Sequence, residues 1–211
     1  MKKIFLFNGP PGSGKDTASV MFKNLIGDVY HYKMAYPLKE SCHKMLGLIG
    51  SLEELEPIKE KPLYFHPSAD FIANNKNLKK PLQLYLNAGA ETVTDLRQFY
   101  IHLSENVMKP MFGDDIFGQL AVRYVSQNEN KYVTISDCGF AAEVQPLIEY
   151  YGESSFTLVK IYREGKTFAN DSRNYIDLPN VHTFEIQNNG TMEELEDKLR
   201  NIAQTILGRE F

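Results

Sequence analysis

The sequence GPPGSGKDT at residues 9–17 follows the apolar run IFLF at residues 4–7 and precedes apolar side chains at helical spacing over residues 18–26. Up to Lys15 its spacing matches G-x-x-x-x-G-K-[ST]. In that motif the glycines let backbone N–H groups turn inward around phosphate oxygens, and the lysine ammonium reaches the β- and γ-phosphates. The helix that follows adds the positive potential of its N-terminal amides. The stretch therefore predicts a phosphate-binding loop, in preference to a glycine-rich turn that only links a strand to a helix.

Asp16 departs from this motif, because it stands where a Mg²⁺-binding hydroxyl is expected. A hydroxyl follows one residue later, at Thr17. Mg²⁺ gives up its waters reluctantly. We therefore expect an ion held mostly through waters and phosphate oxygens, with Thr17 beside a phosphate and close to the metal.

Composition and charge restrict the partners. The 23 basic and 27 acidic residues give a net charge of −4, which produces no field that would attract a nucleic-acid polymer or an anionic membrane. A small anion bound by a local cluster remains compatible. Cys42 and Cys138 are the only cysteines, and we find no metal-binding cysteine spacing, no signal peptide and no apolar run of membrane-spanning length. We expect a cytoplasmic protein that binds no membrane and no nucleic acid stably.

Five runs of strand-forming residues alternate with helical patterns along the chain. A length of 211 residues suits a single α/β domain, residues 1–211, with a small insertion. Strands that alternate with helices are typical of a parallel sheet covered on both faces. We predict a three-layer α/β fold of the P-loop NTPase type, with a mainly five-stranded parallel sheet flanked by helices. The strand-forming runs are residues 4–7, 29–34, 131–137, 156–162 and 182–186.

Residues 47–80 interrupt this alternation with prolines and a polar, turn-like stretch. We interpret them as an insertion or flap that either covers a substrate or is a solvated surface excursion. Helical patterns return at residues 81–88 and 94–108. Residues 47–110 are therefore expected to form a helical insertion on the substrate side.

Asp137 ends the strand-forming run 131–137. An acidic side chain at the carboxyl end of a strand can hold Mg²⁺ or its waters beside phosphates bound at a P-loop. The alternative is a cap for the helical segment 141–150, because aspartate is common at helix N-termini. We favour the metal-binding interpretation.

Arg163, Lys166 and Arg173 place three cations on the loop after strand 156–162. Phosphoryl transfer needs positive charge over the transferred group, and arginine supplies a planar fork for it. The loop leaves a parallel strand at the edge where the phosphate loop also opens. We therefore predict a lid over residues 163–178 that excludes water, in preference to a merely solvated charged loop.

Several short motifs follow one another in a fixed order along most of the chain. They are KIFL at 3–6, GKDT at 14–17, AYPLK at 35–39, the helix from Arg97 to Lys109, FGDD at 112–115, SD at 136–137, REG at 163–165, NDS at 170–172, IQNNGT at 186–191 and EEL at 193–195. In this order they resemble bacteriophage deoxynucleoside monophosphate kinases. The resemblance implies a P-loop kinase core, ATP- and Mg²⁺-dependent phosphorylation of a deoxynucleoside monophosphate to the diphosphate, a homodimer in many members, and the host cytoplasm as location.

The resemblance also suggests roles for single residues. Lys15 matches the phosphate-loop lysine, Asp137 the acidic strand-end residue, Arg163 the lid arginine, and Arg97 an arginine at the start of the substrate-side helix. The implied catalytic residues are Lys15, Arg163, Arg173 and Asp137. The implied ATP-binding residues are Gly12, Ser13, Gly14, Lys15, Asp16, Thr17 and Asn189, and the metal-binding residues are Asp137 and Thr17. The implied acceptor-binding residues are Lys39, Arg97, Lys109 and Tyr36.

Two positions depart from the family pattern. Lys109 stands where arginine is more frequent, and Gly139 stands where Ser-Asp-x-Arg-Phe would place a further arginine. Arg173 can take up part of the lost charge. These departures leave the identity of the acceptor open. The role of Tyr36 is also open, because an aromatic residue near a helix is more often part of a core than a surface on which a base stacks.

Other functions remain open from the sequence. A P-loop kinase for another small phosphorylated acceptor would keep the donor-side residues and fail with nucleotides. A nucleotide-binding switch or accessory protein would bind ATP or GTP without transferring a phosphoryl group, although no guanine-reading Asn-Lys-x-Asp motif occurs in a suitable late loop. A kinase for nucleic-acid ends is disfavoured by the acidic balance and the lack of a basic stripe.

Overall fold

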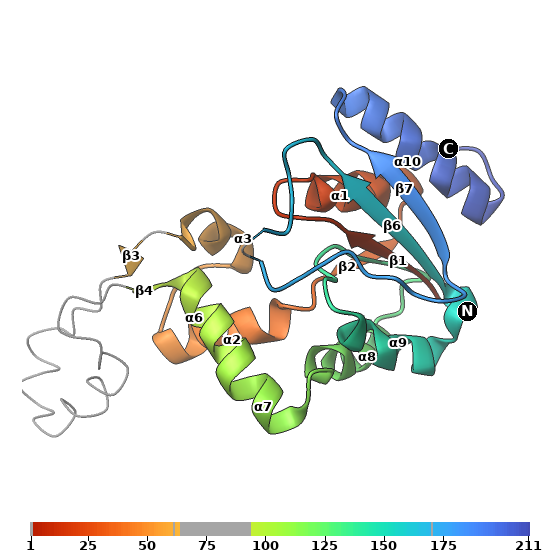
Figure 1. Ribbon diagram of the computed structural model, residues 1–211. Helices are drawn as coiled ribbons and strands as arrows, with labels where there is room; N and C mark the ends of the chain where they lie inside the picture. Colours follow the sequence, from red (N-terminus) through yellow and green to blue (C-terminus); the bar gives the residue numbers. More distant parts are fainter. Residues whose placement is uncertain (1, 61, 64–93, 170) are drawn as a thin grey trace, which may run out of the picture. The chain divides into compact units, whose positions relative to one another are not determined.

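The protein is described from a computed structural model, which describes residues 2–60, 62–63, 94–169 and 171–211. The chain divides into two compact units (Figure 1). One unit contains Met1–Pro37 and Met108–Phe211, and the other contains Leu38–Val107. The predicted insertion, residues 47–110, falls largely in the second unit. The helix predicted at residues 81–88 lies outside the described residues.

The first unit is built on a five-stranded parallel sheet, as the sequence predicts. Its strands lie in the order β2-β5-β1-β6-β7. β1 occupies the centre, where Leu6 is in register with Ile135 of one neighbour and Leu158 of the other. The five strands are β1 (Lys3–Asn8), β2 (Val29–Tyr32), β5 (Tyr132–Ile135), β6 (Phe156–Tyr162) and β7 (His182–Gln187).

The connections out of β1 and β5 run in opposite directions across this sheet. From β1 the chain passes over β5 to reach β2, whereas from β5 it passes over β1 to reach β6. Adjacent parallel strands whose connections diverge open a crevice at their carboxyl ends, where ligands bind in open α/β sheets. The loops that follow β1 and β5 are therefore the segments placed to form a site.

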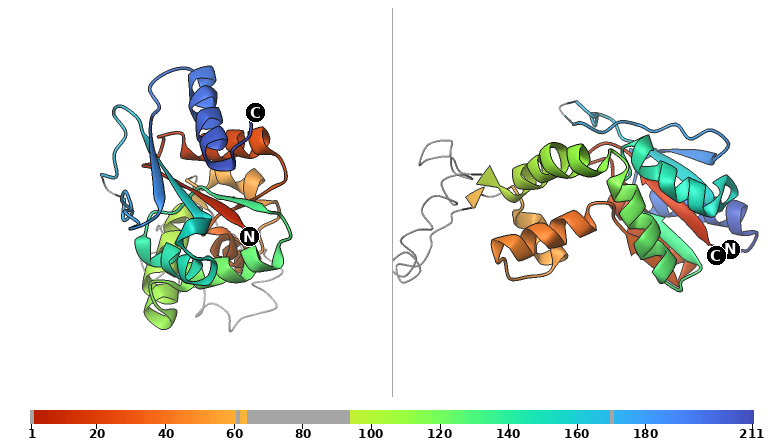
Figure 2. Two further views of the ribbon diagram at one scale, coloured as in Figure 1. Left: turned by 90° about the vertical axis from the view of Figure 1, so that its right-hand side faces the viewer. Right: turned by 90° about the horizontal axis from the view of Figure 1, so that it is seen from below.

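Helices cover both faces of the sheet and complete three layers. α1 (Lys15–Ile26) packs with α10 (Met192–Leu207) on one face, and α8 (Ile116–Gln127) packs with α9 (Ala141–Tyr151) on the other (Figures 1 and 2). The amphipathic patterns of these segments require such burial, because a helix with an apolar stripe must cover it against another layer. The three-layer P-loop architecture predicted from the sequence is confirmed.

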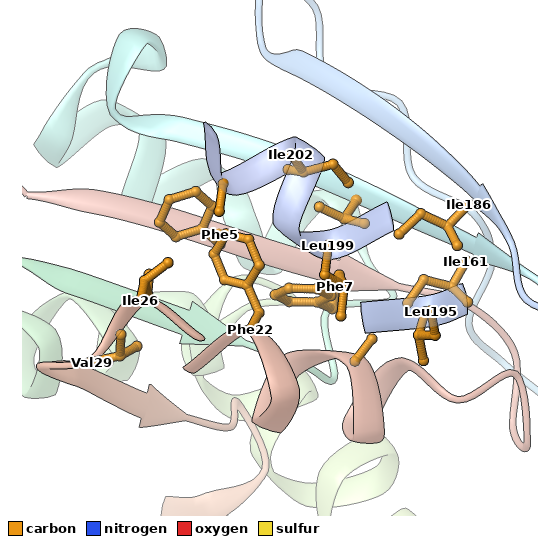
Figure 3. Packing of buried hydrophobic residues seen from close by; sticks show 13 residues of the cluster. Phe5, Phe7, Phe22, Ile26, Val29, Ile161, Ile186, Leu195, Leu199 and Ile202 are labelled. Carbon is orange, nitrogen blue, oxygen red and sulfur yellow. The ribbon is translucent and has the colours of Figure 1, made fainter. Parts of the chain in front are cut away.

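The core beneath α1 holds the phosphate loop in place. Phe5 and Phe7 of β1 lie against Phe22 of α1, with ring centroids 4.7 and 5.7 Å apart (Figure 3). All three rings are fully buried, and burial of each such side chain stabilises the fold by roughly 1.5–3 kcal/mol. The strand before the loop and the helix after it are thus packed against each other, which fixes both ends of the six-residue connection at residues 9–14.

Gly118 permits the close approach of α8 to α9. A Cβ at this position would overlap the backbone carbonyl oxygen of Glu143 and lie 3.1 Å from Cδ of Pro146. Gly118→Ala is therefore expected to lower the free energy of unfolding by about 1–3 kcal/mol, since overpacking forces helices apart. Urea denaturation measures the change. Ser126→Ala on the exposed side of α8 is the control, expected within about 0.5 kcal/mol of the wild type, and equal midpoints for all three proteins would contradict this packing.

The second unit differs from the sequence prediction at its second helix. One helix was expected over residues 94–108, but Thr94–Asp95 forms strand β4, which pairs antiparallel with β3 (Pro62–Leu63). The Asp95 side chain accepts a hydrogen bond from the Gln98 amide at 2.7 Å, so the helix begins only after it. A strand of two residues has no alternation that a sequence pattern could reveal. The helical part is α6 (Leu96–Leu103), followed by the π-helix η2 (Ser104–Met108).

The remaining elements of the described chain are all helical. They are α2 (Tyr36–Leu46), α3 (Leu52–Leu55), the 3₁₀ helix η1 (Glu56–Ile58), α7 (Lys109–Phe112) and the 3₁₀ helix η3 (Glu153–Ser155). No helix among the described residues is both long enough and apolar enough to cross a lipid bilayer.

Candidate functional site

The phosphate loop joins β1 to α1 through a backbone that only glycine adopts readily. Gly12 and Gly14 have φ angles of +75° and +93°, a region that side chains disfavour. The Ser13 amide donates to the Pro10 carbonyl at 3.1 Å, and the Ala18 amide begins the helix by donating to the Gly14 carbonyl at 2.8 Å. The loop thus has the turn that directs backbone amides toward a bound anion.

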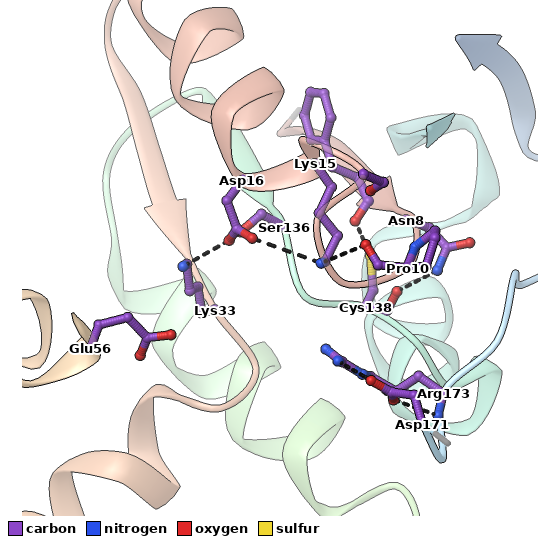
Figure 4. Close-up of polar contacts among 12 residues, drawn as sticks. Asn8, Pro10, Lys15, Asp16, Lys33, Glu56, Ser136, Cys138, Asp171 and Arg173 are labelled. Atoms are coloured by element: carbon purple, nitrogen blue, oxygen red, sulfur yellow. Dashed lines mark hydrogen bonds and ion pairs between the residues drawn. The ribbon is translucent and has the colours of Figure 1, made fainter. Parts of the chain in front are cut away.

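Two polar groups in this loop are buried in ways that suit a ligand. The Ser13 hydroxyl is fully buried and has no hydrogen-bond partner among the described residues. The Lys15 side chain lies back along the loop and is 7% exposed, with its ammonium 3.4 Å from the Pro10 carbonyl oxygen (Figure 4). Burial lowers the pKa of Lys15, and Arg173 adds to this, while Asp16, Asp137 and Asp171 oppose it. A phosphate would satisfy an ammonium held this way.

Asp16, the position that departs from the motif, is paired within the protein. The Lys33 ammonium lies 2.8 Å from its Oδ1, and the Ser136 hydroxyl donates to the same oxygen at 3.0 Å (Figure 4). Burial alone would raise the pKa of Asp16, but the charge and hydrogen bond of Lys33, together with the charge of Lys15 and the hydrogen bond from Ser136, lower it. Sequence reasoning missed Lys33 and Ser136. Both residues lie near the carboxyl end of a strand-forming run, and this position in the sequence could have identified them as candidates.

Asp137 binds the chain that leads from β2 into α2. Its two carboxylate oxygens accept hydrogen bonds from the backbone amides of Met34 at 2.8 Å and Ala35 at 3.0 Å. The alternative interpretation, a cap for the helix at 141–150, is wrong, because Phe140 is the N-cap residue of α9 and makes no side-chain cap. Asp137 instead anchors the turn that carries Lys33.

The oxygen-rich part of the site is compatible with a hydrated Mg²⁺. A carboxylate such as that of Asp137 and a hydroxyl such as that of Thr17 are ligands of the type that this ion prefers. Asp137 already accepts two backbone hydrogen bonds, but its carboxylate has further lone pairs for waters. The described residues contain no cluster of three or more His, Cys, Asp or Glu that could hold an ion on its own. The residues therefore fit a metal held through waters and phosphate oxygens.

Arg173 reaches the crevice from the loop after β6. Its guanidinium donates to both oxygens of Asp171, from Nε at 2.8 Å and from Nη2 at 2.6 Å. Its aliphatic stem packs on Gly139, where a Cβ would lie 2.5–2.6 Å from Cβ, Cγ and Cδ of Arg173. The glycine that departs from the family pattern therefore makes room for the stem of Arg173.

Asn8 ties this loop to the end of β1. Its amide nitrogen donates to the carbonyl oxygen of Cys138 at 2.8 Å (Figure 4). The same nitrogen donates to the carbonyl oxygen of Asn174 at 3.1 Å, and Oδ1 accepts a hydrogen bond from the Ile176 amide at 3.0 Å. Asn8 directly precedes the phosphate loop and is 1% exposed. A buried amide with three strong partners fixes the loops after β1, β5 and β6 relative to one another. It was not among the predicted site residues.

The loop after β6 also meets the phosphate loop directly. Lys166 lies over Gly12, where a Cβ would be 3.2 Å from Cε of the lysine. Asn189 accepts a hydrogen bond from the Glu164 amide at 2.8 Å, whereas its neighbour Asn188 donates to the Ser13 carbonyl oxygen at 2.8 Å. The predicted Asn189 thus orders the turn at 163–166, and the contact with the phosphate loop comes from Asn188.

A cavity of about 580 Å³ lies between this loop and the end of β7. Its aromatic residues are in contact, since Tyr162 stacks on Tyr175 with centroids 4.5 Å apart and Phe168 meets Tyr175 edge-on at 5.1 Å. Arg163, the predicted lid arginine, is exposed and lines the same cavity. The cavity has the planar apolar surface and the polar rim that suit a flat heterocycle.

The predicted acceptor residues lie in different surroundings. In the first unit, Lys109 is 9% exposed, with its ammonium 3.7 Å from Glu143 Oε1 and 3.9 Å from the Phe140 ring centroid. Tyr36 meets the Tyr32 ring edge-on, with centroids 6.2 Å apart.

In the second unit, both predicted cations face carboxylates. Lys39 lies 2.6 Å from Glu56, which also pairs with Lys59 at 2.5 Å, and the two lysines lower the pKa of Glu56 to about 2 against the effect of its burial. Arg97 is 3.5 Å from Glu60.

Comparison with known proteins bears only on the fold. No protein-family model matches the sequence, and no curated protein matches it. Among solved structures, a sugar kinase from Janibacter sp. is similar at 12% identity over 99% of this chain and 95% of that chain, with a TM-score of 0.43. The tunicamycin resistance protein of Deinococcus radiodurans is 7% identical over 98% and 96% (TM-score 0.44), and dephospho-CoA kinase of Campylobacter jejuni 14% identical over 99% of both chains (TM-score 0.40). Likenesses at these identities and TM-scores do not indicate the function of this protein.

Proposed function

We propose that this protein is an ATP-dependent phosphotransferase that phosphorylates a deoxynucleoside 5′-monophosphate to the diphosphate. The observation that carries the proposal is the convergence of a P-loop, its lysine and a forked arginine at one crevice. Lys15, Lys33 and Arg173 balance Asp16, Asp137 and Asp171 there, and these charges influence one another. A guanidinium from a second loop accelerates phosphoryl transfer by stabilising charge on the transferred group, whereas nucleotide binding alone does not depend on such a group.

The reaction needs no covalent intermediate and no base from the protein. An anionic oxygen of the acceptor 5′-phosphate attacks the γ-phosphorus of ATP, the bond from that phosphorus to the β,γ-bridging oxygen breaks, and its electron pair stays on ADP. The protein has to hold donor and acceptor in line, neutralise their mutual repulsion and exclude water. Mg²⁺, when bound, would neutralise charge on the β- and γ-phosphates.

We assign the donor side to residues of the first unit. Lys15 and the loop amides bind the β- and γ-phosphates, and the hydroxyl of Ser13 gains a partner when a phosphate is bound. Asp137 and Thr17 hold waters of the metal. The aromatic cavity accepts the adenine, and Arg163 and Lys166 close over the phosphates as part of a lid at residues 163–178. Arg173 stabilises the charge that develops on the transferred group.

We assign binding of the acceptor phosphate to Lys39 and Arg97. Tyr36 lies beside the acceptor base, and Lys109 also contributes to acceptor binding. The proposal also includes a soluble cytoplasmic protein, host cytoplasm if the chain is viral, and a homodimer. These assignments rest on the resemblance to phage kinases and on the charges of the second unit.

The first experiment measures ADP release from MgATP with each common dNMP and NMP, together with a control that lacks acceptor. A dNMP-dependent rate that disappears in Lys15→Ala would support the kinase and name its base. ATP binding without any acceptor-dependent rate would reject the nucleotide kinase.

A kinase for another small phosphorylated acceptor is the second candidate. It is favoured by Lys109, whose buried ammonium faces Glu143, and by Gly139, which carries no side chain. In the pattern of the phage kinases, arginine is more frequent at the position of Lys109, and a further arginine stands at the position of Gly139. This enzyme would release ADP with a phosphorylated alcohol or a dephospho-coenzyme and not with any nucleotide.

Arg97→Ala tests the acceptor side. It is expected to raise the acceptor KM roughly 10- to 100-fold, because a charged hydrogen bond to phosphate is worth about 1.5–3 kcal/mol, and to leave the ATP KM nearly unchanged. Steady-state kinetics with each substrate varied in turn separates the two. Arg123→Ala on the exposed face of α8 is the control, and an effect of Arg97→Ala confined to ATP would remove Arg97 from the acceptor site.

A further inference from the structure

The first turn of α1 presents a carboxylate to the phosphate crevice. Asp16 follows Lys15 directly, and its side chain is 52% exposed. The N-terminal end of a helix favours anions, so Asp16 is acceptable there as long as the crevice is empty. A bound polyphosphate brings further negative charge to the same helix end, where it and the Asp16 carboxylate repel each other. An aspartate at this position therefore needs a permanent counter-charge.

Lys33 is placed to supply that charge. Its ammonium is 2.8 Å from Asp16 Oδ1, and its side chain is only 23% exposed. The Lys15 ammonium is also near this carboxylate, but at 3.8 Å from Oδ2, and it is the group that would bind the phosphates. The Ser136 hydroxyl donates to Asp16 Oδ1 at 3.0 Å, which fixes the carboxylate from the β5 side. Because Lys33 is largely desolvated and Ser136 holds the Asp16 carboxylate, salt screens this pair less than an ion pair between two fully exposed side chains.

The backbone around Lys33 is fixed independently of Asp16. The amides of the next two residues, Met34 and Ala35, donate to the two oxygens of Asp137 at 2.8 and 3.0 Å. The lysine thus extends from a turn that is anchored at the end of β5, within the crevice between β1 and β5. Lys33 is therefore held in place as part of the site, although it belongs neither to the P-loop motif nor to the motifs that carry the family resemblance.

We propose that Lys33 and Asp16 act as one nucleotide-binding element, in which Lys33 cancels the charge of Asp16 so that this P-loop accepts polyphosphate with an aspartate in the hydroxyl position. The inference rests on the proposed function in so far as it takes the phosphate of the ligand to be that of MgATP. It concerns binding of the donor alone and does not depend on the acceptor.

Charge variants at the two positions should therefore act in opposite directions. Lys33→Met leaves the Asp16 carboxylate with only the more distant Lys15 ammonium, 3.8 Å from Oδ2, which a bound phosphate also claims. The variant should therefore weaken MgATP binding roughly tenfold or more at low salt. Asp16→Asn leaves Lys33 free to attract phosphate and should tighten binding several-fold. The double variant restores the balance and should return to within about threefold of the wild type. The loss in Lys33→Met should shrink as salt is added, because an exposed carboxylate is screened.

The measurement is equilibrium titration of each purified protein with MgATP, by calorimetry, with thermal unfolding as a check that each variant is folded. The control is Lys23→Met. Lys23 is an exposed residue of α1, the helix that contains Asp16, so this variant removes one positive charge outside the crevice and should bind MgATP as the wild type does. If Lys33→Met is unfolded, Lys33→Gln takes its place.

Unchanged affinity in folded Lys33→Met would overturn the pairing, as would a double variant no tighter than Lys33→Met, or a wild type that binds no MgATP. A wild type that binds MgATP and shows the compensation, but transfers phosphate to no nucleotide, would support the pair and reject the proposed acceptor.

Discussion

Replacement of Lys15 by alanine is expected to lower the turnover of the phosphotransferase by roughly 10²- to 10³-fold, the usual cost of removing one preorganised donor to a developing charge. Lys15 is 7% exposed and is held over the loop, 3.4 Å from the Pro10 carbonyl oxygen. The fold should persist, because the loop is clamped by Phe5, Phe7 and Phe22.

The measurement is kcat with saturating MgATP and acceptor, with circular dichroism and thermal unfolding to confirm the fold. Lys23→Ala changes an exposed lysine of the same helix and is the matched control, expected to retain nearly full turnover. A folded Lys15→Ala protein with a near-normal rate would remove the P-loop from the mechanism.

Arg173→Ala is expected to reduce kcat by roughly 10³-fold, in line with arginines that stabilise transferred phosphoryl groups, with a smaller effect on the KM for ATP. The guanidinium is held by two hydrogen bonds to Asp171 and its stem by contact with Gly139. A preorganised group contributes to the transition state without a cost of reorganisation. Arg173→Lys keeps a charge but loses the fork and should recover only a small part of the rate.

The control is Arg200→Ala in α10, which removes another arginine paired to a carboxylate, here Glu196 at 2.8 Å, and should leave kcat unchanged. Equal kcat values for Arg173→Ala and the wild type, or a loss that is entirely a loss of thermal stability, would place Arg173 outside the reaction and make its pair with Asp171 structural.

The main features of the fold were predictable because they depend on local patterns. The strand-forming runs and the amphipathic helices identify a parallel sheet with two covered faces, and the phosphate loop is contained in nine consecutive residues. The predicted boundaries fail where a partner distant in sequence decides them. Thr94 and Asp95 form a strand because they pair with Pro62 and Leu63, and no pattern in two residues announces this.

Within the site, sequence and tertiary structure determined different things. The sequence by itself determined the loop, because glycines at positive φ, a lysine and a following helix have to be neighbours in the chain to form an anion site. Only the tertiary structure decided how that site is balanced. Lys33, which follows β2, pairs with Asp16 of α1. Asn8 joins three loops, and Gly139 leaves space for the stem of Arg173. These residues are far apart in sequence, and they meet only because parallel strands bring their carboxyl ends to one edge, where charge and volume must be matched across the sheet.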